Sequence, residues 1–230
     1  MSVHITGDTH GEFSRFSYEK WPEGKGLTGE DVVIVTGDFG LLWTSYVSDN
    51  EAYHIKWLNS KPWMTLFVDG NHEHHPRLSA LPQKEMFGGT VGVVSDKIFH
   101  LRRGEIYRIQ DKKFFVMGGA DSIDKRQRTR GVSWWPEEVP SHAEMDYGLS
   151  NLEKHQYAID YILSHTAPEN VTEVLLQRYG CAGYDPDPTR KYLQHVCSTA
   201  TFEKLYCGHW HEDIIISRYN FLYDNIVKVF

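Results

Sequence analysis

The sequence predicts an α/β protein with mixed sheets, and three observations support this fold class. First, five short β-rich runs each end in a cluster of glycine, aspartate or histidine, and continuous apolar runs of this length are typical of strands buried on both faces. Second, helix-like segments separate these runs. Third, two further regions alternate short apolar stretches with polar turns, as antiparallel strands do. The five runs are VHITGDTHG (3–11), DVVIVTGDFG (31–40), MTLFVDGNHE (64–73), AIDYILSHTAP (158–168) and KLYCGHWHE (204–212).

Four segments between the strands are expected to be helices. They span residues 49–60, 141–156, 169–180 and 187–200. Ser141 and Glu144 have the spacing of a capping box and favour a helix start there. Gly180 is expected to end the third helix.

Two regions are expected to be antiparallel, and one to be irregular. Residues 90–119 contain short strands around the polar turn QDKK, and residues 213–230 have the pattern of a β-hairpin. Residues 118–141 fit neither helix nor strand, and long irregular segments within compact domains are often functional loops. Packing of Trp134 and Trp135 over the core explains this segment equally well.

Length and composition indicate an ordinary soluble protein. The 230 residues are expected to form one domain, 1–230, with 40% hydrophobic and 24% charged residues. The net charge of −7 argues against a general nucleic-acid-binding surface. The three cysteines Cys181, Cys197 and Cys207 contain no C-x-x-C pair, which suits a reducing compartment. No secretion signal or membrane-spanning apolar run is evident, so we expect a cytoplasmic protein without a membrane partner.

Metal-binding side chains gather at the ends of the five predicted strands. Ligands bind beyond the carboxyl ends of strands in open α/β sheets, so these side chains are expected to share one cleft. Two carboxylates, five imidazoles and an amide suit a pair of divalent transition ions about 3.5–4 Å apart, bridged by one carboxylate. The residues are Asp8, His10, Asp38, Asn71, His72, His165, His209 and His211.

The local spacing suggests how these side chains reach one cleft. Residues i and i+2 of an extended segment point to the same side, so Asp8 with His10 and His209 with His211 would point together if their strands continued that far. Glycines precede Asp8, Asp38, Asn71 and His209, and they are expected to allow tight turns and close backbone approach.

Five short motifs in a fixed order resemble those of the calcineurin-like metallophosphoesterase superfamily. They are GDTHG, GDFG, GNHE, a lone SH and GHWH, and they extend from residue 7 to residue 211. Each motif alone could arise by chance, but five in this order, each after a β-like run, are specific. The resemblance implies a four-layer α/β/β/α sandwich of two mixed sheets flanked by helices.

The resemblance also implies a role for each motif residue. Asp8, His10 and His211 would bind a first divalent metal ion, Asp38 would bridge both ions, and the second ion would be completed by Asn71, His165 and His209. Manganese is the expected metal, with iron, zinc, nickel and magnesium as alternatives. A hydroxide held between two cations is a nucleophile at neutral pH because the metals lower its pKa. His72 would contact the phosphate and protonate the leaving oxygen.

Departures from the protein-phosphatase branch favour one substrate class. That branch has GDxVDRG at the second motif and an arginine before GNHE, whereas this chain has GDFGLLW and Asp69. We therefore expect a phosphomonoesterase or phosphodiesterase acting on a nucleotide, a nucleic-acid end or another phosphorylated small molecule. The alternatives are a serine/threonine protein phosphatase and a non-catalytic binding module that retains the fold. No protein partner can be deduced.

Several residues around the motifs each have two candidate roles. Arg126, Arg128 and Arg130 form either a solvated face or a basic rim that binds substrate phosphate, since arginine makes bidentate bonds to phosphate. His74 and His75 are expected to be substrate contacts or solvated loop residues rather than supports for the metal ligands. Glu73 would orient a ligand or cap the local backbone.

Overall fold

Short apolar runs form the strands of two mixed sheets in the computed structural model, which describes residues 1–180 and 186–230. The first sheet has the order β13-β1-β2-β3-β6-β5-β4 and the second β11-β12-β10-β9-β8-β7. Strands β1, β2, β3 and β6 run parallel, as do β8, β9, β10 and β12, and the outer pairs are antiparallel. The strands are β1 (Val3–Thr6), β2 (Val32–Thr36), β3 (Met64–Val68), β4 (Gln83–Met86), β5 (Gly89–Ser95), β6 (Ile98–Leu101), β7 (Ile106–Ile109), β8 (Lys112–Met117), β9 (Tyr161–Ser164), β10 (Lys204–Cys207), β11 (Ile214–Ile216), β12 (Tyr219–Phe221) and β13 (Val227–Lys228).

The four predicted helices are present and begin and end within two residues of the expected positions. At the start of α3, the Ser141 side chain accepts a hydrogen bond from the Glu144 N–H, and Glu144 accepts one from the Ser141 N–H, so the predicted capping box forms. Gly180 follows α4 with a φ of +67°. The α-helices are α1 (Asp49–Asn59), α2 (His75–Ser79), α3 (His142–Lys154), α4 (Glu169–Arg178) and α5 (Pro188–Thr199), and 3₁₀ turns span Phe13–Phe16, Pro22–Gly26, Lys125–Gln127 and Pro136–Glu138.

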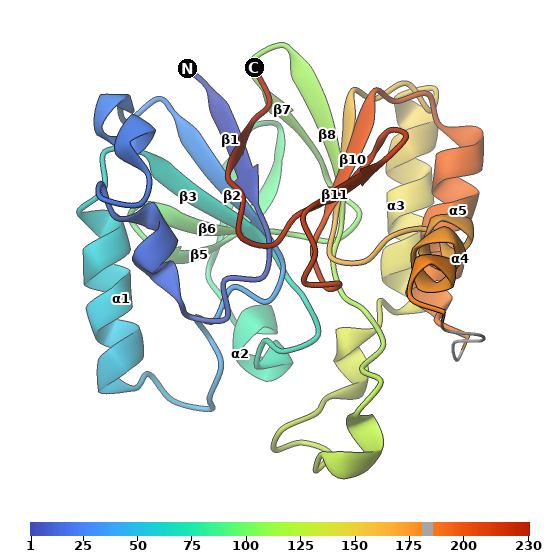
Figure 1. Cartoon of the computed structure of the whole chain (residues 1–230), viewed down its shortest axis with the longest axis horizontal. Helices are drawn as coiled ribbons and strands as arrows, with labels where there is room; N and C mark the ends of the chain where they lie inside the picture. Colours follow the sequence, from blue (N-terminus) through green and yellow to red (C-terminus); the bar gives the residue numbers. More distant parts are fainter. Residues whose placement is uncertain (181–185) are drawn as a thin grey trace.

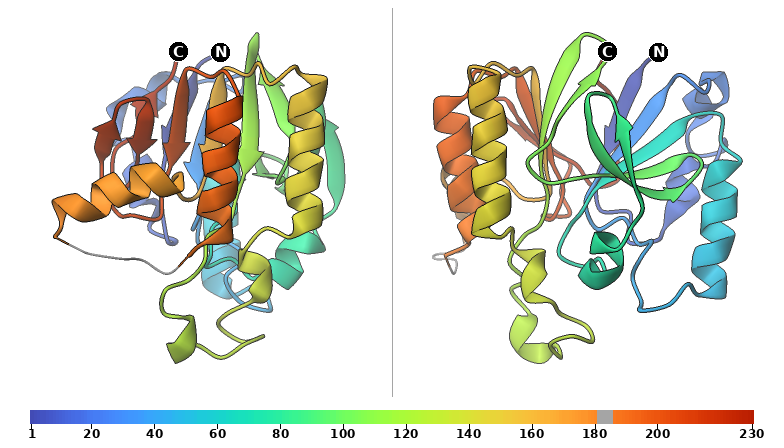
Figure 2. Two further views of the ribbon diagram at one scale, coloured as in Figure 1. Left: turned by 90° about the vertical axis from the view of Figure 1, so that its right-hand side faces the viewer. Right: turned by 180° about the vertical axis from the view of Figure 1, so that it is seen from behind.

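The two sheets pack face to face between two helical layers, which confirms the predicted four-layer sandwich (Figures 1 and 2). Apolar side chains from both sheets form the central core. Helix α1 covers the outer face of the first sheet, and α3, α4 and α5 cover that of the second. Both chain termini lie at the same end of the molecule (Figure 1). Within the described residues, no helix is long and apolar enough to span a membrane.

The structure refines three of the predicted regions. Residues 90–119 do contain antiparallel pairs, but β5 and β6 belong to the first sheet and β7 and β8 to the second. The tail forms the hairpin β11–β12, and β13 then crosses to pair with β1 of the other sheet. Residues 118–141 are irregular apart from two 3₁₀ turns, and Trp135 within them is buried. Helix α2 and strand β4 were not predicted.

Candidate metal centre

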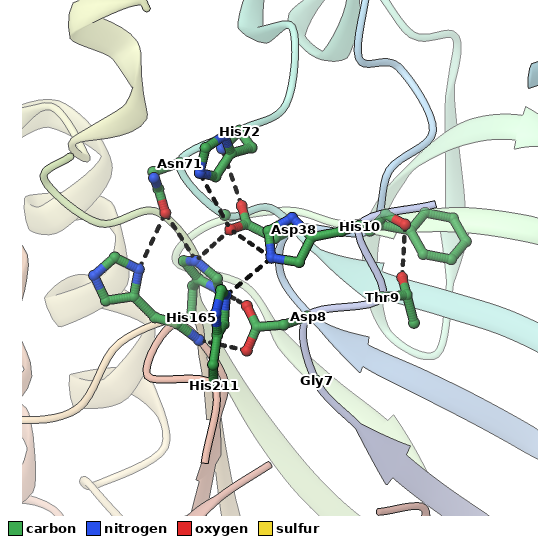
Figure 3. Close-up of polar contacts among 12 residues, drawn as sticks. Gly7, Asp8, Thr9, His10, Asp38, Asn71, His72, His165 and His211 are labelled. Carbon is green, nitrogen blue, oxygen red and sulfur yellow. Dashed lines mark hydrogen bonds and ion pairs between the residues drawn. The ribbon is translucent and has the colours of Figure 1, made fainter. Parts of the chain in front are cut away.

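The five motifs meet at one edge of the sandwich, where the parallel strands of both sheets end (Figure 3). Asp8, Asp38 and Asn71 follow β1, β2 and β3, while His165 and His209 follow β9 and β10. Because parallel neighbours present their carboxyl ends at the same sheet edge, these side chains come together from segments far apart in the chain. All seven candidate metal ligands and His72 lie in this cluster.

Asp38 occupies the middle of the cluster. Its Oδ2 lies 3.4 Å from His165 Nε2, 3.8 Å from His10 Nε2 and 3.9 Å from His72 Nε2. Its Oδ1 accepts a hydrogen bond of 3.0 Å from the backbone N–H of His72. His10 belongs to the predicted first metal site and His165 to the second. A single carboxylate therefore contacts both sites, which is the position that a bridging ligand requires.

Asp8, His10 and His211 form the half of the cluster nearer the surface. The Nε2 atoms of His10 and His211 lie 3.0 Å apart, and the ligand atoms of all three residues fall within 4.8 Å of one another. Asp8 Oδ2 accepts a hydrogen bond from the His209 N–H at 2.7 Å, whereas Asp8 Oδ1 is buried and has no hydrogen-bond partner among the described residues. Two imidazole nitrogens beside a buried unpartnered carboxylate oxygen are a donor set that fits a divalent transition ion.

Asn71, His165 and His209 form the deeper half. Asn71 Oδ1 lies 3.0 Å from His165 Nε2 and 3.1 Å from His209 Nδ1. The Nδ1–H of His165 donates to the Thr36 carbonyl at 2.9 Å, and this bond turns Nε2 toward Asp38. The amide of Asn71 donates to Ser122 Oγ at 2.9 Å, so its oxygen faces the cluster.

The electrostatics of the cluster favour a cation. Burial raises the pKa of Asp8 well above its ordinary value, and the charge of Asp38 adds to this effect. Burial would also raise the pKa of Asp38, but His165 and the other histidines around it hold that pKa below its ordinary value. Burial alone would lower the pKa of His165, yet Asp38 and Asp8 raise it to about 10. Burial lowers the pKa of His10 to about 4 and that of His209 to about 3. A divalent ion would stabilise the two buried carboxylates together with the neutral imidazoles of His10 and His209.

The backbone at these positions differs from the predicted extended conformation. Strand β1 ends at Thr6 and β10 at Cys207, so the explanation that residues i and i+2 of a strand point together is wrong. Instead Asp8, His10, Asp38, His209 and His211 all have left-handed φ angles, of 40°, 46°, 48°, 69° and 50°. Positive φ is uncommon outside glycine, and such backbone strain concentrates at functional sites. Left-handed turns, not strand alternation, direct these side chains into one cluster.

Gly37 and Gly70 are among the preceding glycines that make room for the cluster, as predicted. Gly37 has a φ of +92°, and a Cβ there would overlap the His165 ring. A Cβ at Gly70 would overlap the Asp38 carboxylate. Any larger residue at either position would displace a candidate ligand.

Only one of the three predicted basic residues reaches the cluster. Arg128 places Nη1 and Nη2 each 3.1 Å from a ring nitrogen of His72, and it also pairs with Asp124 at 2.8 Å. Arg126 and Arg130 are exposed, and among the described residues neither contacts the cluster. Of the three arginines, Arg128 is the one that contacts a residue of the cluster in the described part of the chain, and substrate binding by the three stays a prediction.

Four contacts around the cluster were missed by sequence reasoning. The Trp43 ring stacks on His72, with centroids 5.2 Å apart and planes at 10°. Ser122, which holds Asn71, is itself held by the Glu138 carboxylate through its N–H and its hydroxyl, at 2.7 and 2.8 Å. The Arg15 guanidinium donates to the Gly7 carbonyl next to Asp8. Two sequence features could have indicated these contacts. Trp43 is the last residue of the motif segment GDFGLLW, and Ser122 lies shortly after strand β8.

The three residues after His72 are fully or partly buried. Glu73 is fully buried and accepts hydrogen bonds from the N–H groups of Phe39 (2.7 Å) and Gly70 (2.6 Å), so it caps the local backbone, one of its two predicted roles. The expectation that His75 is a solvated loop residue is wrong, because it is 3% exposed at the start of α2, and its other expected role as a substrate contact stays a prediction. His74 caps the same helix through an Arg77 N–H bond of 3.2 Å and contacts the Trp135 ring.

Comparison with known proteins agrees with this arrangement. A family model for calcineurin-like phosphoesterases matches residues 1–213. No curated protein matches the chain. Proteins of this family are in general metal-dependent hydrolases of phosphoesters, and the Asp and His groups described above could bind metal. The protein therefore belongs to the calcineurin-like phosphoesterase family.

Proposed function

We propose that this protein is a phosphoesterase that uses two divalent metal ions. One ion would be held by Asp8, His10, Asp38 and His211, and the other by Asp38, Asn71, His165 and His209. The observation that carries this proposal is the convergence of these donors on Asp38, with the buried Asp8 Oδ1 lacking a partner among the described residues. When bound, the ions would supply Lewis acidity and a hydroxide nucleophile at neutral pH.

The side chains around the metal ligands have distinct tasks in this proposal. Arg128 holds the phosphoryl oxygens of the substrate through its guanidinium. His72 gives a proton to the leaving oxygen, and its position beside Asp38, whose charge favours the protonated imidazole, supports this role. Asp38 keeps the two halves of the cluster together.

Activity is expected to depend on added metal. Purified protein supplied with manganese should hydrolyse an aryl phosphate or aryl phosphodiester, and a chelator should abolish the reaction because the nucleophile is then lost. The release of the coloured aryl alcohol measures the rate, and a series of manganese, iron, zinc, nickel and magnesium identifies the preferred ion. Turnover that persists after chelation and removal of metal would rule out the proposed chemistry.

Arg128 is expected to contribute to substrate binding, and Arg126 and Arg130 are not. Arg128→Ala should raise KM roughly tenfold to a hundredfold, since a charge-assisted hydrogen bond contributes about 1.5–3 kcal/mol. Arg126→Ala is the matched control, because its side chain is exposed in the same segment. Steady-state kinetics of the two variants provide the test, and equal KM values would contradict the role of Arg128.

We further propose that the substrate is a nucleotide or a nucleic-acid end. Trp43 supports this preference, because it is 37% exposed and its ring lies against His72 at the cluster. An exposed aromatic ring beside a phosphate site suits stacking with a nucleobase. This exposed ring favours a substrate with a base over a phosphoserine or phosphothreonine side chain.

Trp43→Ala is expected to raise KM for a base-carrying phosphoester by about five- to a hundredfold, given about 1–3 kcal/mol per stacked base. The KM for an alkyl phosphoester without a ring should stay unchanged, and Trp43→Phe should restore most of the affinity. The same loss for both substrates would show that Trp43 only supports His72.

We also propose a cytoplasmic location. The thiols of Cys197 and Cys207 are free and buried, as suits a reducing compartment. Cys181 lies outside the described residues.

A further inference from the structure

A cavity lies next to the segment that carries Asn71 and His72. Its volume is about 830 Å³, and Asp69 and His75, at the two ends of that segment, form part of its wall. Residues of helix α2, strand β5 and the start of α3 line it. None of the seven candidate metal ligands lines this cavity, and neither does His72. It is therefore distinct from the metal centre.

Glu105 is an unpaired carboxylate in the wall of this cavity. Its side chain is only 7% exposed, yet no hydrogen bond or ion pair to its carboxylate occurs among the described residues. The two arginines beside it in the chain are engaged elsewhere. Arg103 pairs with Asp69 at 2.6 Å, and Arg102 donates to Gln83 at 3.0 Å. This carboxylate is therefore available to a cationic ligand that enters the cavity.

A second polar group of the same wall is also unsatisfied. His75 Nε2 is buried and has no hydrogen-bond partner among the described residues. Buried polar atoms of this kind are uncommon in native proteins and call for an explanation such as a bound ligand. His75 and Glu105 come from separate elements, so the two observations are independent.

The remaining lining defines the chemistry of the ligand. The lining contains four carboxylates and two guanidinium groups, which gives it a net charge of −2. The carboxylates are those of Asp69, Glu105, Glu137 and Glu144, and the guanidinium groups are those of Arg102 and Arg103. The potential therefore favours a cation. Among the described residues, the groups with metal-binding geometry lie only at the metal centre, which argues for an organic cation here. Apolar side chains supply a surface for a hydrocarbon stem, and they are Leu78, Leu81, Val139, Pro136 and Pro140.

We propose that this cavity binds a small organic cation that carries a guanidinium or ammonium group on a short aliphatic stem. The cationic group pairs with the Glu105 carboxylate, and the stem lies against the apolar wall. This binding does not depend on phosphoester hydrolysis.

Isothermal titration calorimetry of the full chain with agmatine tests the proposal. Agmatine should bind the wild-type protein saturably, and Glu105→Gln should weaken this binding tenfold or more, because the isosteric amide removes only the charge. Glu153→Gln, which removes a charge from the exposed face of α3, is the matched control and should bind as the wild type does. Absence of binding to the wild type, or equal affinity in Glu105→Gln, would overturn the proposal.

A second variant tests the place of binding without altering Glu105. Ala143 is exposed at the start of α3 and lines the cavity, so Ala143→Trp should fill its mouth. We expect loss of agmatine binding with phosphoester hydrolysis unchanged. Unaltered agmatine binding in a folded Ala143→Trp protein would place the ligand elsewhere and overturn the proposal. Since the readout is a heat of binding, failure here is distinguishable from failure of the phosphoesterase proposal.

Discussion

Asp38→Asn is expected to lower kcat/KM for an aryl phosphoester by about a thousandfold or more and to remove most of the bound metal. The Oδ2 atom of Asp38 lies within 3.9 Å of nitrogens from His10, His72 and His165, so this one atom contacts both halves of the cluster. Losing a bridging negative charge removes several kcal/mol of metal binding and transition-state stabilisation, and each 1.36 kcal/mol is tenfold in rate.

The experiment separates loss of metal from loss of fold. Metal content is measured by inductively coupled plasma mass spectrometry, and thermal unfolding is followed by circular dichroism. Asp111→Asn serves as the control, because Asp111 is exposed in the β7–β8 turn and the substitution is chemically identical. If Asp38→Asn retained both ions and near-normal turnover, Asp38 would not be the bridge.

The parts of this structure that could be predicted from the sequence are those encoded by local signals. The central strands are uninterrupted apolar runs, and the capping box at Ser141 lies within four residues, so neither needs tertiary information. The candidate ligands were recognisable because each stands in a short motif directly after a strand. Their convergence then follows from the parallel order of β1, β2 and β3.

Features that depend on distant contacts could not be predicted. Ser122 orients Asn71 across 51 residues, and no local pattern relates the two. The burial of His75 depends on the packing around α2, a five-residue helix too short to show a hydrophobic period. The left-handed turns at Asp8 and His10 have a partial signal, since aspartate and histidine tolerate positive φ better than most residues. That tolerance alone does not distinguish a turn from a strand end.

His72→Asn is expected to reduce kcat by about 10²–10⁴-fold for an alkyl phosphoester while leaving the metal content nearly intact. The His72 ring lies 3.9 Å from Asp38 Oδ2, between the Trp43 ring and the Arg128 guanidinium, and so faces the position of a substrate. Its backbone N–H donates to Asp38 Oδ1, and asparagine preserves this bond. The substitution therefore removes the proton donor and leaves the candidate metal ligands in place.

Dependence on the leaving group distinguishes a proton donor from a merely structural residue. An alkoxide needs a proton to depart, whereas p-nitrophenolate is stable without one, so His72→Asn should slow the nitrophenyl ester far less than the alkyl ester. Loss of packing against Trp43 would instead slow both esters equally. The metal content of the same samples tests a third possibility, that His72 binds a metal ion. If His72→Asn emptied the site, His72 would be a ligand rather than an acid, and the division of roles between Asn71 and His72 would be wrong.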